Sequence, residues 1–234
     1  MARRKSQLRY ARPDLEYLEI RGNVDTRLRK LHDGDYDAII LAAAGLTRLG
    51  WAMKITERLS KDLMLPAVGQ GALGLETRSD DEAARAAVFS LDHASSHTAV
   101  LAERTLLAEL RGGCSAPIGA WGRFTAGNEL TLTAVVLSPD GTERIAAEER
   151  ATIAPNADWA TLAVVAERLG KETAMLLIQA GAERMIWARA AKPLNHLTFL
   201  RIHQELPVGR GTLASRKVIG PARSRCGRYA SRLF

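Results

Sequence analysis

A single thiol in a distinctive setting is the first candidate for chemistry. Cys114 is one of two cysteines in 234 residues and lies in the stretch Glu109-Leu-Arg-Gly-Gly-Cys-Ser-Ala-Pro-Ile118. A helical run precedes it, Gly112 and Gly113 are expected to stop that helix, and Pro117 prevents the helix from resuming. The sequence therefore predicts a thiol on a short loop at a helix end. Such a thiol either has a chemical role or is an inert buried cysteine.

A set of arginines is the second candidate. Arg21 and Arg48 each follow an expected β-strand, and Arg27 lies one turn into the helix between those strands. Ligands of open α/β sheets bind at the C-terminal ends of strands, so these side chains are expected at one crevice edge, where Arg3 and Arg4 can join them. The planar guanidinium binds carboxylates through two parallel hydrogen bonds. Two interpretations remain, a polycarboxylate site and a set of solvated surface arginines.

A βαβ unit is the element that would position these arginines. Residues 15–20 are predicted to form a strand, and Asn23 is a suitable N-cap for a helix over residues 24–31 that Gly34 closes. Residues 36–42 form a short apolar run of the kind buried in parallel sheets. A strand, a helix and a strand within about 30 residues predict a right-handed crossover in an α/β domain.

The second half of the chain has an α+β pattern. Helices are predicted over residues 80–91 and 95–110, and the second leads to Cys114. Three β-rich segments separated by turns predict a small antiparallel sheet, with strands at 118–124, 130–137 and 144–151. A long amphipathic helix over 159–180, closed by Gly181, is expected to cover this sheet.

Two further motifs carry little weight. Residues 65–75 are rich in glycine but lack the full dinucleotide-binding pattern, so an irregular strand or a crossing between domains is the better interpretation. His93 and His97 have a spacing that suits metal binding, but the sequence places no third ligand near them. We expect no metal site.

The charge of +7 is distributed unevenly. From residue 187 to the end, ten Lys and Arg residues face a single Glu, while the rest of the chain has 23 basic and 25 acidic residues. The body therefore lacks the basic surface of a nucleic-acid-binding protein, and the tail is expected to be disordered. No secretory signal or membrane-length apolar run is present, and two cysteines suit a reducing compartment, so a cytoplasmic location is expected.

Four stretches, in order and with compatible spacing, resemble the porphobilinogen deaminase (hydroxymethylbilane synthase) family. They are residues 18–31, 36–50, 65–76 and 110–119. The resemblance runs from about Arg3 to Ile186. It implies a cytoplasmic transferase of tetrapyrrole and heme biosynthesis that joins four porphobilinogen units into hydroxymethylbilane with release of ammonia. The full-length family is monomeric.

The resemblance also implies roles for the candidate residues. Cys114 would hold a dipyrromethane cofactor through a thioether, and this cofactor primes the reaction. Because each pyrrole carries an acetate and a propionate, a cleft lined by Arg3, Arg4, Arg21, Arg27 and Arg48 would bind the growing chain. No metal is implied.

The resemblance implies a domain arrangement with one departure from the family. Residues 1–64 would be the later half of a periplasmic-binding-protein-like α/β domain, 65–92 a segment crossing into the first domain, and 93–187 the C-terminal α+β domain. Residues 188–234 are a basic tail without a family counterpart. The family's N-terminal segment, which supplies a catalytic aspartate beside a lysine, is not matched, so no catalytic residue is assigned. The alternative function is an inactive fragment that binds anionic pyrroles or complements an N-terminal half.

Overall fold

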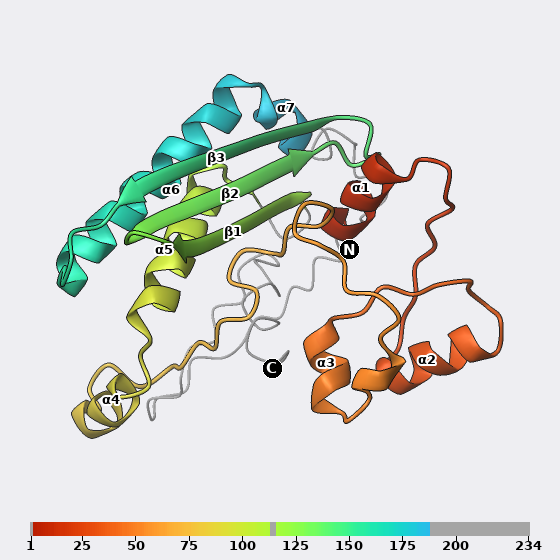
Figure 1. The fold of residues 1–234 in the computed structure, drawn as a ribbon, viewed down its shortest axis with the longest axis horizontal. Helices are drawn as coiled ribbons and strands as arrows, with labels where there is room; N and C mark the ends of the chain where they lie inside the picture. Colours follow the sequence, from red (N-terminus) through yellow and green to blue (C-terminus); the bar gives the residue numbers. More distant parts are fainter. Residues whose placement is uncertain (1, 113–115, 188–234) are drawn as a thin grey trace, which may run out of the picture.

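The computed structural model describes residues 2–112 and 116–187, and the C-terminal part of these forms two layers (Figure 1). A three-stranded antiparallel sheet in the order β1-β2-β3 carries helices on one face. The strands are β1 (Ile118–Thr125), β2 (Glu129–Leu137) and β3 (Arg144–Thr152). The helices are α5 (Ala94–Glu109), α6 (Trp159–Gln179) and the short α7 (Ala182–Trp187). The predicted sheet and its covering helices are confirmed.

Alternation along the strands explains which face is buried. The middle strand turns a row of fully buried apolar side chains toward the helices, namely Leu130, Leu132, Ala134 and Val136. The preceding turn places Gly127 and Asn128 at φ values of 78° and 55°. Gly and Asn tolerate this left-handed geometry, so the turn residues set the strand register that buries the apolar row.

Helix α5 packs closely against both the sheet and α6. A Cβ atom at Gly170 of α6 would lie 2.6 Å from the carbonyl oxygen of Ala102. A Cβ atom at Gly122 of β1 would lie 2.7 Å from the carbonyl oxygen of Ala99. Both distances are shorter than a side chain allows, so the missing side chains permit the close approach of three elements.

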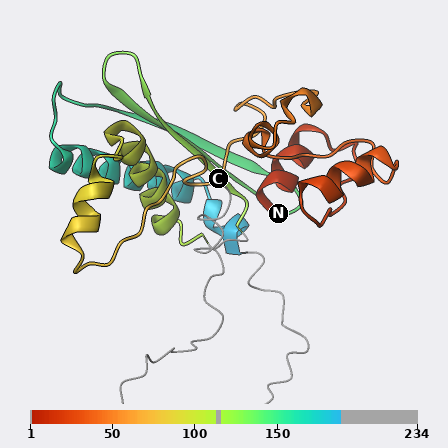
Figure 2. The same cartoon turned by 90° about the horizontal axis from the view of Figure 1, so that it is seen from below.

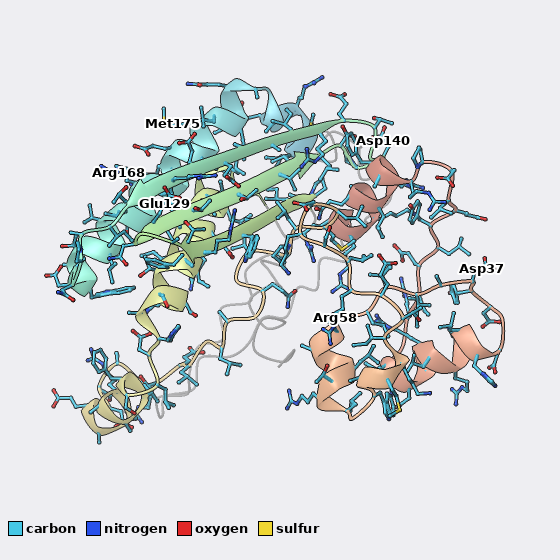
Figure 3. All side chains as sticks on the ribbon, in the orientation of Figure 1. Asp37, Arg58, Glu129, Asp140, Arg168 and Met175 are labelled. Atoms are coloured by element: carbon cyan, nitrogen blue, oxygen red, sulfur yellow. The ribbon has the colours of Figure 1, made fainter. Side chains whose placement is uncertain are left out.

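Helix α6 has one buried and one exposed face. Leu169, Thr173 and Leu177 are fully buried, whereas Arg168 and Met175 project from the outer face of the helix (Figure 3). The helix is therefore amphipathic. In the described ranges, no helix combines the length and the apolar character needed to cross a membrane.

The sheet face away from α5 and α6 carries a polar network. The Thr133 hydroxyl donates to Glu148 at 2.6 Å, and the guanidinium groups of Arg150 and Arg123 approach the same carboxylate at 2.9 and 3.2 Å. These contacts, with the Thr133 hydrogen bond as the largest cause, lower the pKa of Glu148 to about 2. The Glu148 carboxylate therefore has a hydroxyl donor and two guanidinium groups beside it.

The N-terminal part contains short helices joined by extended chain (Figures 1 and 2). They are α1 (Ala2–Ala11), α2 (Val24–His32), α3 (Ala43–Arg48), the 3-10 helix η1 (Ala52–Lys54) and α4 (Glu82–Phe89). Helix α1 lies beside the turn between β2 and β3, where Asp140 is labelled in Figure 3. The Ser6 hydroxyl donates to the carbonyl of Pro139 at 3.3 Å in this contact. The predicted helices over 24–31 and 80–91 are confirmed.

The two strands predicted around α2 are not formed. Residues 15–20 and 36–42 are extended, but no strand is assigned to either segment. A hydrogen bond from the Tyr36 hydroxyl to the carbonyl of Glu19, at 3.2 Å, connects the two segments. A parallel sheet needs several strands, and both of its faces are buried under other elements. The side chain of Leu18, in contrast, is 62% exposed. The prediction of a βαβ unit is therefore wrong for the described chain, and the α/β part of the fold appears as helices and extended segments.

The approach of α5 to α6 can be tested with Gly170→Ala. Alanine is favoured over glycine inside a helix by about 1 kcal/mol, but the added Cβ would collide with the Ala102 carbonyl. We expect the collision to dominate and to lower the free energy of unfolding by about 1–3 kcal/mol, measured by urea denaturation. The matched control is Gly45→Ala in α3, where no atom lies within 4 Å of the new Cβ. Equal effects of the two substitutions would contradict the packing described above.

Candidate functional site

Two arginines of α1 are partly buried near other cations. The Arg3 guanidinium donates to the carbonyl oxygen of Leu65 at 2.5 Å. Burial, and then the charge of Arg4, lower the pKa of Arg3 to about 10. Burial, and then the charge of Arg27, lower the pKa of Arg4. Arg3 and Arg4 of α1 thus combine partial burial with a neighbouring positive charge, from Arg4 and from Arg27 of α2 respectively, and such a setting favours an anionic ligand.

Arg27 is held in place by the start of helix α2. Asn23 is the N-cap, and its side-chain oxygen accepts a hydrogen bond from the backbone N–H of Thr26 at 2.9 Å. The Arg27 Nε donates to the carbonyl of Gly22 at 2.8 Å. Gly22 has φ of 119°, and a Cβ atom there would lie 2.9 Å from Thr26. The tight Gly-Asn corner therefore fixes the direction of the Arg27 side chain.

The other two predicted arginines are exposed. The Arg21 side chain is 92% exposed, and its guanidinium lies 3.9 Å from the Glu19 carboxylate. Arg48 ends helix α3 and is exposed. The expected crevice edge depended on two strands that the structure does not form, so a common site for all five arginines stays a prediction.

Cys114 and Gly113 lie outside the described residues, as does Cys226, but both flanks of Cys114 are visible. Helix α5 ends at Glu109, and Arg111, with φ of 48°, adopts the left-handed conformation expected for Gly112. A Cβ atom at Gly112 would lie close to the Cδ1 atoms of Ile118 and Leu107, so the ends of those two side chains would have to shift to accommodate it. In the sequence, Cys114 thus lies between the end of α5 and the start of β1.

Other candidate residues take structural roles. The Asp92 carboxylate accepts a hydrogen bond from the Nδ1 of His97 at 3.0 Å, and the His97 ring lies 4.0 Å, centroid to centroid, from the ring of Trp159. Within residues 2–112 and 116–187, no group of three or more His, Cys, Asp or Glu residues could hold a metal ion. Lys61 and Asp62 form a Lys-Asp dipeptide that follows the arginines in sequence, and the Lys61 ammonium lies 5.7 Å from the Trp121 ring centroid.

One buried acid was missed by the sequence analysis. Glu103 lies on α5 among apolar positions and is 5% exposed. The only signal in the sequence was a carboxylate within the apolar stripe that also contains Ala99, Ala102 and Leu106. Such a residue needs hydrogen-bond donors when it is buried, and those donors are far away in sequence.

The N-cap of α2 can be tested through Asn23→Ala. Loss of the Asn23 side-chain acceptor should lower the free energy of unfolding of the α2 region by about 0.5–2 kcal/mol. Amide hydrogen exchange at Thr26 and Arg27 is the measurement, since it reports local opening. Asn23→Asp keeps an acceptor at this position and is the control. Unchanged protection at Thr26 in the alanine variant would show that Asn23 does not fix this corner.

Comparison with known proteins gives two family models in the order of the chain. Residues 1–86 match the model described as "Porphobilinogen deaminase, dipyromethane cofactor binding domain". Residues 97–179 match the model described as "Porphobilinogen deaminase, C-terminal domain". Together the two models account for more than half of the chain; the first match ends within α4 and the second begins within α5.

Curated proteins similar to this chain are named porphobilinogen deaminase. The chain is 49% identical over 181 residues to porphobilinogen deaminase of Desulforudis audaxviator, an alignment that covers 77% of the chain and 58% of the relative. It is 44% identical over 184 residues to the protein of that name from Syntrophobacter fumaroxidans, covering 79% and 56%. It is 46% identical over 185 residues to the one from Geobacillus sp., also covering 79% and 56%. The chain spans about half the length of these relatives. On both domain models and this level of identity, the chain belongs to the porphobilinogen deaminase family.

Proposed function

We propose that this chain provides the cofactor anchor and part of the carboxylate-binding cleft of a hydroxymethylbilane synthase. Such an enzyme joins four porphobilinogen units into a linear tetrapyrrole and releases one ammonia for each unit added. The observation that carries the proposal is the group of Arg3, Arg4 and Arg27, in a chain that matches both domain models of the family in order. A polyanionic product is the ligand that such a group would retain.

The dipyrromethane cofactor fits the residues of this group. Its acetate and propionate carboxylates would offset the two causes that lower the pKa of Arg4, which are burial and then the charge of Arg27. When bound, the cofactor supplies the pyrrole end to which new units are joined. The role of Cys114 is to hold it through a C–S bond, and Arg3, Arg4 and Arg27 orient carboxylates through charge-assisted hydrogen bonds, each contributing about 1.5–3 kcal/mol. Arg21 and Arg48 belong to the same proposed cleft as exposed cations at its outer part.

The proposal includes a division of the chain into domains. Residues 1–64 would be the later half of a periplasmic-binding-protein-like domain, 65–92 a crossing segment, and 93–187 the cysteine-bearing domain. Exposed apolar side chains support the assignment of residues 65–92 as a crossing segment, since Leu73 is 74% exposed and Phe89 is 77% exposed. Such side chains favour a partner surface. The tail, residues 188–234, lies outside the described residues.

The anchor role of Cys114 is tested by intact mass. Hydroxymethylbilane has a terminal hydroxymethyl group, so a thiol that attacks its methylene carbon forms a thioether and releases water. We expect the chain to gain the corresponding mass, and Cys226→Ser to gain it equally. Cys114→Ser should gain nothing, because the attacking sulfur is gone. An adduct that persists in Cys114→Ser would place the anchor elsewhere.

An alternative function is a fragment that binds anionic pyrroles or complements an N-terminal half without turnover of its own. The observation in its favour is that the chain spans about half the length of the relatives it matches. We expect the isolated chain to consume porphobilinogen at close to the background rate, measured as ammonia release. Cys114→Ser sets that background. A rate well above it would favour a complete catalyst over the fragment.

A further inference from the structure

Residues 65–69 pass between the two parts of the chain and are held from both sides. On the α1 side, the Gln7 amide binds the backbone of Leu65 twice. Its Oε1 accepts from the Leu65 N–H at 2.8 Å, and its Nε2 donates to the Leu65 carbonyl at 3.1 Å. The Arg3 guanidinium donates to the same carbonyl. A buried glutamine here imitates a neighbouring β-strand, which satisfies both polar groups of one residue.

On the other side, the same segment covers the edge of the sheet. The Ala120 N–H of β1 donates to the carbonyl of Pro66 at 3.1 Å. A Cβ atom at Gly119 would lie 2.9 Å from the Cβ of Leu65, so the two backbones are closely packed. The segment therefore protects an edge strand that would otherwise expose unpaired backbone groups.

Glu103 joins this segment to the helix that leads toward the cysteine. Its Oε2 accepts the backbone N–H of Gly69 at 2.6 Å, and its Oε1 accepts the backbone N–H of Gly122 at 2.7 Å. One carboxylate thus connects α5, β1 and the 65–69 segment. Both carboxylate oxygens accept a hydrogen bond, so the ionised form of Glu103 satisfies both backbone N–H groups. A protonated acid or an amide at this position would instead point a hydrogen-bond donor at one of these N–H groups.

The surroundings of Glu103 contain few charges. Burial raises its pKa, and the two backbone N–H groups oppose that effect. Residues 65–72 contain no titratable group. On β1 the charged residue is Arg123, which binds Thr133 and Glu148 on the opposite face of the sheet. On the neighbouring helices the charged side chains are exposed, namely Arg104 and Glu109 of α5 and Glu167, Arg168, Lys171 and Glu172 of α6. The two glycine amides are therefore the groups that report its ionisation.

We propose that Gln7 and Glu103 are positioning residues that clamp residues 65–69 from opposite sides. The clamp holds α1, with Arg3 and Arg4, in a fixed relation to α5, the helix that precedes Cys114 in the sequence. The importance of the clamp for catalysis rests on the proposed function, because the arginines and the Cys114 thiol bind the same ligand only if the chain holds the dipyrromethane cofactor. The clamp itself is a property of the fold and can be measured without any pyrrole.

The first test is a pH titration of backbone amide NMR signals in the full chain. In the wild type, the Gly69 and Gly122 signals should shift together with a shared midpoint above 4.5, the ordinary pKa of a glutamate. Glu103→Gln should abolish both shifts, and Glu109→Gln, on the same helix but exposed, should leave them unchanged. Separate midpoints or static signals in the wild type would overturn the role of Glu103, even if Glu103→Gln does not fold.

The second test asks whether the two sides act as one unit. Gln7→Leu should accelerate exchange of the Leu65 amide about tenfold, and Glu103→Gln should do the same for Gly69. If the two sides form a clamp, Gln7→Leu also accelerates exchange of the Gly69 amide, and Glu103→Gln also accelerates exchange of the Leu65 amide. The effects of the two substitutions on exchange are then not additive in the double variant. Gln179→Leu, at the exposed end of α6, is the matched control. Strictly local and additive effects would overturn the clamp. Loss of the mass adduct with intact coupling would instead count against the proposed function alone.

Discussion

The close approach of α5 to β1 and α6 is the constraint on which the rest of the structure depends. It exists because Gly122 and Gly170 place no side chain against the α5 backbone. This short separation brings the Glu103 carboxylate within reach of two backbone N–H groups, one on the sheet and one on the segment from the N-terminal part. A larger residue at either glycine would move α5 outward, and the connection between the two matched domains would weaken with it.

Electrostatics divide the molecule into two kinds of surface. On the sheet face away from α5 and α6, the positive charge of Arg123 is balanced by the carboxylate of Glu148. Around α1 and α2 the situation is reversed, because Arg4 has the charge of Arg27 near it and is partly buried. Like charges held together in a folded chain cost free energy, and a carboxylate-rich ligand would recover it. The difference between the surfaces is the physical basis for placing a pyrrole-carboxylate site on the N-terminal part.

The two strands predicted around α2 show what a local pattern leaves undecided. Residues 36–42 form an apolar run of the kind buried in parallel sheets, yet neither this segment nor residues 15–20 is assigned as a strand. Strand pairing depends on neighbours far away in sequence. Local features needed no such partners. Asn23 caps α2, and Gly34 and Gly181 follow helix ends with positive φ, as expected.

The sequence by itself determined the elements that depend on nearby residues. These were the antiparallel sheet, its turn at Gly127 and Asn128, the helices that cover it, and the likeness to one family through stretches around Arg3, Arg27 and Cys114. Only the tertiary structure decided which arginines meet, and it assigned the left-handed helix end to Arg111, because Gly112 lies against Ile118. It alone also revealed Glu103 and Gln7 as links, since their partners lie 19 to 58 residues away in the chain. Periodicity and capping act over a few residues, whereas burial and charge proximity depend on how distant segments pack.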